Sequence, residues 1–136
     1  MNPISLTVRP IVEAKKIIEA EVLFTSSPIA FLQGVDPEKG IVSDKKSEIF
    51  GKEFHGKVLV FPNAVGSSVG AYVIYRLKKN RKAPLAMINR VSDIITASGC
   101  ALAAIPLYDV ETGSFESLKT HRKITIENKK GTVILQ

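Results

Sequence analysis

Short apolar segments alternate with polar turns along the chain, and their periods predict both strands and helices. Residues 4–8 alternate apolar and polar side chains, as a strand with one buried face does. Residues 57–61 (KVLVF) are a nearly continuous apolar run of strand length, which is typical of a central strand covered on both faces. Near the other end, residues 123–128 and 131–135 predict a closing pair of antiparallel strands, linked through residues 129–131.

The middle of the chain predicts strand–helix–strand units. Residues 67–80 (SSVGAYVIYRLKKN) have the length and the polar ending of a helix. Residues 84–90 predict the next strand, a short helix follows Ser92 or Asp93, and another strand is expected around residues 105–107. Such units, with extended segments at both ends, predict an α/β fold in which parallel and antiparallel strands mix and helices pack on one side.

Three other segments have less regular patterns. Residues 13–24 combine helix-favouring alanine, lysine and glutamate with an apolar end, so a strand is predicted only for their second half. Residues 26–42 predict a short extended segment, a turn at residues 36–40 and a returning strand, and residues 111–114 predict a further turn. No internal repeat or linker divides the sequence, so residues 1–136 are expected to form one domain.

The composition excludes several classes of protein. A chain of 136 residues is long enough for one well-buried core. No apolar run approaches the roughly 18 residues of a membrane span. The first ten residues also lack the apolar core and cleavage site of a secretory signal. A cytoplasmic protein without a membrane partner is therefore expected.

The cysteine and histidine residues limit which disulfides, nucleophiles and metal sites the chain can have. The single cysteine, Cys100, excludes an internal disulfide, and its apolar surroundings (SGCALAAIP) favour a buried structural thiol over a nucleophile. His55 and His121 lie in polar, turn-like contexts and are expected to be solvated. Without a ligand-like spacing of histidines and carboxylates, the chain is not expected to bind a metal by itself.

The net charge of +6 is compatible with a nucleic acid, an acidic protein or an anionic substrate as the partner. The densest basic cluster, residues 76–82, follows the predicted helix, where cations complement the C-terminal dipole and Pro84 prevents continuation. No aromatic residues alternate with these cations as base stacking would require. A nucleic-acid partner is therefore not expected, although binding through this cluster remains an alternative to test.

The junction of strand and helix at residues 62–70 (PNAVGSSVG) is the main candidate for chemistry. The first N–H groups of a helix lack intrahelical partners and attract an anion. Ser67 or Ser68 can therefore act as a helix N-cap, or its hydroxyl can lie beside an anionic substrate and accept a proton as an alkoxide stabilised by those N–H groups. The junction matches neither a P-loop nor a nucleophile elbow, and no base lies nearby in sequence.

Several other residues have structural explanations as well as functional ones. Asp36 is expected in a turn before Pro37, Asp93 as a helix N-cap, and Asp109 at the end of a strand. Gly99 is expected to permit close packing, against the serine-containing loop or against a partner chain. Tyr72 and Tyr75 are expected in the core or at an interface.

Four ordered segments, residues 31–42, 56–75, 82–89 and 93–109, resemble the swivel-domain small subunits of the aconitase X group. The resemblance implies a swivelling β/β/α domain. It also implies that Ser67 is the catalytic serine, with Gly66 and Ser68 beside it as substrate-binding residues. The chain departs from the common loop at Ala64 and Val65, where glycine and a basic residue are frequent. This change weakens the inference that the loop alone binds a substrate phosphate.

The same resemblance implies a reaction. Archaeal members of the group dehydrate (R)-5-phosphomevalonate to trans-anhydromevalonate 5-phosphate in a modified mevalonate pathway to isoprenoids. A [4Fe–4S] cluster would act as Lewis acid on the hydroxyl, while Ser67 would remove the C2 proton. Because one thiol cannot ligate a cluster, the resemblance implies that a large subunit carries it and that the active enzyme is a heteromer, with no cluster bound by this chain alone.

Two alternatives to this reaction remain open. Related members of the group dehydrate cis-3-hydroxy-L-proline, and nothing in the sequence excludes a hydroxyproline substrate. The chain could also be a non-catalytic module that uses the helix-terminal turn only to bind an anion.

Overall fold

The computed structural model describes residues 4–127 and 132–135. Within them, the strands are β1 (Ile4–Thr7), β2 (Arg9–Val12), β3 (Ile18–Phe24), β4 (Val35–Asp36), β5 (Ile41–Val42), β6 (Val58–Val60), β7 (Ala86–Asn89), β8 (Leu107–Asp109), β9 (Lys123–Glu127) and β10 (Thr132–Leu135). The helices are α1 (Phe31–Gly34), α2 (Gly70–Lys79), α3 (Ile94–Ala103) and α4 (Thr112–Ser117), the last followed by a 3₁₀ turn, η1 (Leu118–Thr120).

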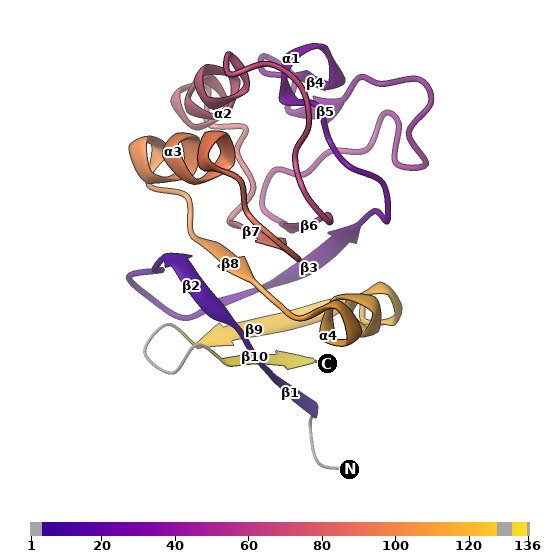
Figure 1. Ribbon diagram of the computed structural model, residues 1–136, viewed down its shortest axis with the longest axis vertical. Helices are drawn as coiled ribbons and strands as arrows, with labels where there is room; N and C mark the ends of the chain where they lie inside the picture. The colour runs from indigo at the N-terminus through magenta and orange to yellow at the C-terminus, as the bar shows by residue number, and fades with distance from the viewer. Residues whose placement is uncertain (1–3, 128–131, 136) are drawn as a thin grey trace.

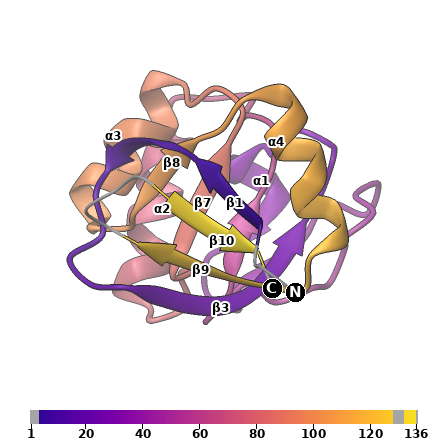
Figure 2. The same cartoon turned by 90° about the horizontal axis from the view of Figure 1, so that it is seen from below.

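The main sheet has the strand order β1-β10-β9-β3-β6-β7-β8-β2. The neighbours β3, β6, β7 and β8 run parallel, and the other pairs are antiparallel. The long strand β3 joins two layers, because Ile18 to Glu21 pair with β9 while Val22 to Phe24 pair with β6. The strands consequently curl round one another, with β9, β10 and β1 beneath the parallel strands (Figures 1 and 2).

Two hydrophobic cores lie on the two faces of the parallel strands. Leu59 and Met87 point into the core beneath α1, α2 and α3. Their neighbours Val58 and Ile88 point into the core shared with β9 and β10, because successive side chains of a strand face opposite sides. Strand β6 is buried at all of its positions, which confirms the prediction of a central strand covered on both faces. The layers are therefore sheet, sheet and helices, as the predicted β/β/α domain requires.

The structure also differs from the sequence-based expectations. Helix α1 lies in a segment that was predicted to be extended before the turn at residues 36–40. Strand β2 was not predicted. It pairs with β8, about a hundred residues further along the chain, with Arg9 opposite Asp109. The turn predicted at residues 111–114 is wrong, because helix α4 begins there. Phe115 and Leu118 are three residues apart in sequence, and both side chains pack into the second core. A helix places residues at this spacing on one face, so the packing favours a helix over a turn. The predicted link at residues 129–131 lies outside the described residues.

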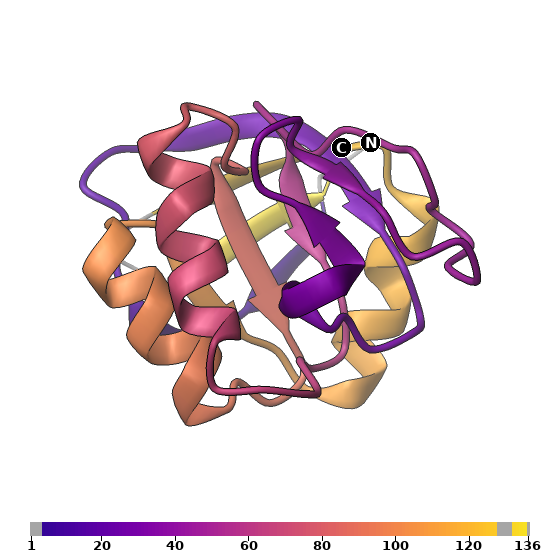
Figure 3. The same ribbon diagram turned by 90° about the horizontal axis from the view of Figure 1, so that it is seen from above.

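Helices α2 and α3 lie side by side over the parallel strands (Figure 3). Each helix returns antiparallel to the strand before it, so both helices begin at the edge of the sheet where β6 and β7 end. Ligands of open α/β sheets bind at this carboxyl edge. The candidate serines lie at the same edge, in the loop that leaves β6.

Candidate active site

Residues 62–69, which we call the serine loop, connect β6 to α2 and are exposed from Val65 to Val69. The Ser67 Oγ accepts a hydrogen bond from the Val69 N–H at 3.1 Å, and the Ser67 carbonyl accepts one from the Gly70 N–H at 2.9 Å. Val69 occupies the N-cap of α2, so the helix cap, one of the two roles considered for Ser67 and Ser68, is not filled by either serine. Ser67 instead stabilises the turn that precedes the helix and keeps its side chain in solvent.

Gly66 gives the serine loop its shape. Its φ of +97° lies in the left-handed region, where side chains with a Cβ are strained. A Cβ at this position would also lie 3.6 Å from the Cβ of Ala30, in ordinary contact. Glycine is thus required here by the backbone turn and not by crowding, and the turn directs the following serines outward.

Hydrogen bonds hold the serine loop between two neighbouring loops. On one side the Ile29 N–H donates to the Asn63 carbonyl at 3.2 Å, and the Val65 N–H donates to the Ile29 carbonyl at 3.0 Å. On the other side the Arg90 N–H donates to the Pro62 carbonyl at 3.0 Å. The loops that follow β3, β6 and β7 therefore form one connected edge.

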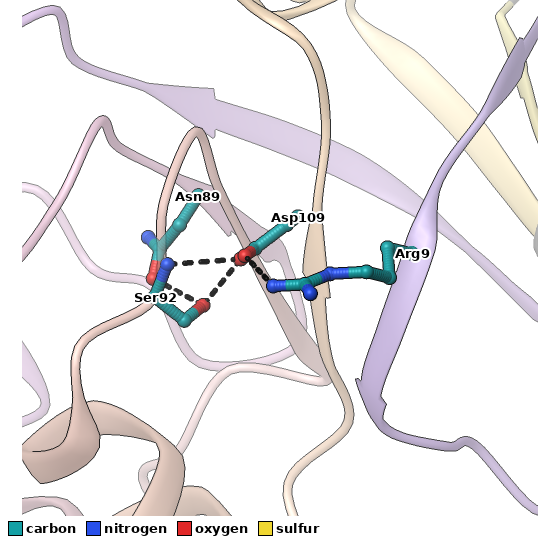
Figure 4. Close-up of polar contacts among 4 residues, drawn as sticks. All are labelled: Arg9, Asn89, Ser92 and Asp109. Atoms are coloured by element: carbon teal, nitrogen blue, oxygen red, sulfur yellow. Dashed lines mark hydrogen bonds and ion pairs between the residues drawn. The ribbon is translucent and has the colours of Figure 1, made fainter.

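A polar network fixes the loop between β7 and α3 (Figure 4). The Ser92 hydroxyl lies 2.5 Å from Asp109 Oδ1 and 3.1 Å from Asn89 Oδ1, and the Ser92 N–H donates to Asp109 Oδ1 at 3.0 Å. Asp109 is 7% exposed, and its second oxygen accepts a hydrogen bond from Arg9 at 3.1 Å. Asn89 donates to the Phe61 carbonyl at 2.9 Å, which ties this network to the start of the serine loop.

Charged side chains are sparse at this edge. Residues 25–35 and 62–75 contain none, and the loops after β7 and β8 contribute only Arg90, Asp93 and Glu111. Asp93 is the N-cap of α3, as predicted, and its carboxylate accepts a hydrogen bond from the Thr96 N–H at 3.2 Å. Within the described residues, the side-chain hydrogen bond of Ser67 is the one from the Val69 N–H, and no carboxylate or histidine there hydrogen-bonds its hydroxyl.

A recess of about 380 Å³ adjoins the serine loop. Its lining combines residues that follow three neighbouring strands: Pro62, Asn63, Ala64, Arg90, Val91, Asp93 and Thr112. A larger recess of about 700 Å³ continues beyond Arg90 and Val91, which line both, toward β1 and β2. Both open recesses thus meet at the loop between β7 and α3.

The Ser67 hydroxyl has the surroundings of a potential proton acceptor. A hydrogen bond donated to an oxygen stabilises that oxygen more strongly when it is negatively charged. The Val69 N–H makes such a bond to Ser67 Oγ, and the positive end of the dipole of α2 lies next to it. Both features favour a negatively charged Ser67 Oγ over the neutral hydroxyl.

The expected structural role of Cys100 is confirmed. The side chain is fully buried in α3, and this burial, with a smaller contribution from the charge of Asp93, raises the pKa of the thiol to about 12. No group of three or more histidine, cysteine, aspartate or glutamate side chains suited to a metal occurs among the residues with described positions. None of the helices there is long and apolar enough to cross a membrane.

The other residues that the sequence analysis considered have separate positions in the structure. Asp36 lies in a turn, as predicted, with its side chain accepting hydrogen bonds from the N–H groups of residues 38 and 39. Gly99 permits close packing, as expected, but against Ala71 and Ile74 of α2 and not against the serine loop itself. Tyr72 and Tyr75 are 60% and 39% exposed, which excludes the core for both.

The two histidines differ in solvent exposure. His55 is exposed, as expected, whereas the Nδ1 of the partly buried His121 lies 2.7 Å from the Ser117 carbonyl. Neither histidine lies in the loops that form the carboxyl edge of the parallel strands.

Sequence reasoning did not single out Asn89, Arg90 and Ser92. A signal for them exists, since these polar residues directly follow an apolar strand segment (PLAMI), at the end where parallel strands present their binding groups. Asp109 was expected only as a strand-end residue, and its contact with Ser92 depends on the pairing of β7 and β8.

Comparison with known proteins adds three kinds of similarity. The sequence model of the family described as the aconitase X swivel domain matches residues 5–135 of this chain. The phosphomevalonate dehydratase small subunit of Methanosarcina acetivorans is 43% identical over 136 residues, which cover 99% of this chain and 93% of that protein. The protein of the same name from Thermococcus kodakarensis is 47% identical over 115 residues, 85% of each chain. The crystal structure of Thermococcus kodakaraensis aconitase X in its holo-form superposes with a TM-score of 0.87 at 42% identity, covering 98% of this chain and 99% of that one.

Proposed function

The chain belongs to the aconitase X swivel-domain family, and from this premise we propose that it is the small subunit of a dehydratase that removes water from (R)-5-phosphomevalonate. The observation that carries the proposal is the similarity of nearly the whole chain to phosphomevalonate dehydratase small subunits, at 43% identity over 99% of its length. The product would be trans-anhydromevalonate 5-phosphate, an intermediate of isoprenoid synthesis.

In this proposal Ser67 is the proton acceptor. Its exposed hydroxyl can contact a molecule held at the carboxyl edge, and the Val69 N–H stabilises the alkoxide that removal of a C2 proton requires. Gly66 and Ser68 flank it and would contact the substrate through backbone and hydroxyl groups. Because no base of the described residues contacts Ser67, deprotonation of the serine is assigned to the partner.

The partner would be the large subunit, and the iron–sulfur cluster of the family would belong to it. The described residues of this chain do not fit such a cluster, because its one thiol is buried and neutral, with a pKa of about 12. A cluster bound elsewhere would supply Lewis acidity toward the leaving hydroxyl. The contribution of this chain would be the positioned serine and the surface on which substrate and partner meet.

Anaerobic reconstitution with the large subunit tests the proposal. The complex with the natural chain is expected to convert phosphomevalonate, and Ser67→Ala is expected to lower kcat by at least about a hundredfold, as loss of a general base does. Ser27→Ala removes an exposed hydroxyl from the neighbouring loop and is expected to leave kcat within about twofold.

Three results would each contradict a different part of the proposal. Full activity of the Ser67→Ala complex would remove the serine from the mechanism while leaving the substrate assignment intact. Turnover of cis-3-hydroxy-L-proline in place of phosphomevalonate would show that the substrate is a hydroxyproline. Tight association with the large subunit without any product would show that the chain is only a binding module.

A further inference from the structure

Arg90 is the cation of the carboxyl edge next to the serine loop. Residues 25–35 and 62–75 carry no charged side chain, so neither the loop after β3 nor the serine loop offers a positive group to a substrate. Among the residues that the structure describes, Arg90 is the one basic residue that lines the 380 Å³ recess beside the serine loop. A substrate with phosphate and carboxylate groups that entered this recess would meet the Arg90 guanidinium.

The guanidinium of Arg90 has unused hydrogen-bonding capacity. Its carbon lies 5.5 Å from the centre of the Phe115 ring, a cation–π contact that holds the group without using its N–H donors. The Nε atom is excluded from solvent and has no hydrogen-bond partner among the residues described by the structure. An arginine presents five N–H donors in a planar fork, and donors that are out of solvent normally have an acceptor.

The nearby carboxylates do not neutralise Arg90. Asp109 is already engaged by Arg9 and by Ser92, and the carboxylate of Asp93 caps α3. Glu111, which lines the larger recess, forms no ion pair with Arg90 within 4 Å. Within residues 4–127 and 132–135, the guanidinium is therefore without a carboxylate partner.

The backbone fixes Arg90 relative to the serine loop. Its N–H donates to the Pro62 carbonyl at 3.0 Å, and Asn89 donates to the Phe61 carbonyl at 2.9 Å. The network of Ser92 and Asp109 holds the other side of the same loop. A group bound by Arg90 would therefore stay in a constant relation to Ser67.

We propose that Arg90 binds an oxyanion of the substrate, a phosphate or carboxylate group, in the recess beside the serine loop. The inference rests on the proposed function, since it assigns Arg90 to the substrate of the same site. A planar guanidinium binds either oxyanion through two parallel N–H donors, which a lysine ammonium cannot do.

Steady-state kinetics of the reconstituted complex test this role. Arg90→Gln is expected to raise KM for phosphomevalonate about tenfold to a hundredfold, the worth of a charge-assisted hydrogen bond. Its kcat is expected to change by less than about threefold, because Ser67 stays in place. Arg76→Gln removes one cation from the far end of α2 and is the matched control, with KM expected within about twofold of the natural complex.

A second variant covers the case in which Arg90→Gln does not fold. Arg90→Lys keeps the charge and the aliphatic stem but loses the planar fork, and a several-fold higher KM is expected. An unchanged KM in a folded Arg90 variant, judged by an unchanged melting temperature, would overturn the proposal. Unphosphorylated mevalonate distinguishes the two oxyanions: a phosphate contact predicts no effect of Arg90→Gln on its KM, and a carboxylate contact predicts the same increase.

A separate NMR measurement distinguishes failure of the proposed function from failure of oxyanion binding by Arg90. If the natural complex does not dehydrate phosphomevalonate, the Nε–H resonance of Arg90 in the ¹⁵N-labelled full chain decides, with inorganic phosphate as the probe. A saturable shift that Ser67→Ala retains and Arg76→Gln leaves unchanged would support oxyanion binding without the dehydratase assignment. No shift in that case would overturn both.

Discussion

Gly99 of α3 lies directly against Ala71 of α2, so that a Cβ added to Gly99 would be 3.1 Å from both the Cα and the carbonyl oxygen of Ala71. Ala71 belongs to the first turn of α2, immediately after the serine loop. The contact between the two helix backbones thus supports the part of the chain that presents Ser67.

We expect Gly99→Ala to destabilise the fold by about 1–3 kcal/mol, because overpacking here meets backbone atoms that cannot rotate away. The first turn of α2 would shift, and the activity of the reconstituted complex would fall as well. Urea unfolding measures the first effect. Gly113→Ala, whose Cβ would meet nothing within 4 Å, is the control and is expected to be neutral or slightly stabilising. Equal stability of the Gly99 and Gly113 variants would contradict the close packing.

Tyr108 anchors the segment between β2 and β3. Its ring is fully buried, and its hydroxyl accepts a hydrogen bond from the Ala14 N–H at 3.1 Å. Tyr108→Phe would leave this buried N–H without an acceptor, which costs about 1–3 kcal/mol of stability. The free energy of unfolding in urea checks the loss. Tyr72→Phe, at a position 60% exposed, should change stability by less than about 0.5 kcal/mol.

Cys100 is expected to be inert in the folded protein. Burial is the main reason that the pKa of its thiol rises to about 12, so the reactive thiolate is essentially absent at pH 8 and reagents cannot reach the sulfur. A disulfide reagent such as dithionitrobenzoate should therefore label it only at the rate of unfolding, and stoichiometrically in urea. Rapid labelling of the native chain would show that the segment around α3 opens readily.

Glu48 links stability to pH. The Ser26 N–H, and then the Thr25 hydroxyl, lower the pKa of its carboxyl below the ordinary 4.5 by donating hydrogen bonds to the charged form. A carboxyl whose pKa is lowered by folding stabilises the protein above its unfolded pKa, and this stabilisation is lost as the pH falls through the folded pKa.

The stability difference between the natural chain and Glu48→Gln should consequently be largest near neutral pH and shrink below about pH 4.5. Urea unfolding at a series of pH values measures it. The side chain is exposed, so the effect is expected to be modest. Glu53→Gln, an exposed carboxylate in a neighbouring segment, provides the comparison. A pH-independent difference for Glu48→Gln would show that the loss is one of packing alone.

The sequence by itself determined the elements whose cause is local. The apolar run at residues 57–61 required a strand covered on both faces, and β6 is buried throughout. The cations at the C-terminal end of α2, the cap at Asp93 and the buried Cys100 also follow from neighbouring residues alone. Each of these depends on the burial, capping or charge of a short segment, which can be inferred without knowing its partners.

Only the tertiary structure decided which distant residues share an edge. Strand β2 forms by antiparallel pairing with β8, which places Arg9 opposite Asp109, and the side chain of Phe115 in α4 packs into the second core. Arg90 comes to lie beside the serine loop because parallel pairing of β6 and β7 aligns their ends. Such contacts depend on strand order and register, which bring together residues far apart in sequence, and no local propensity encodes them.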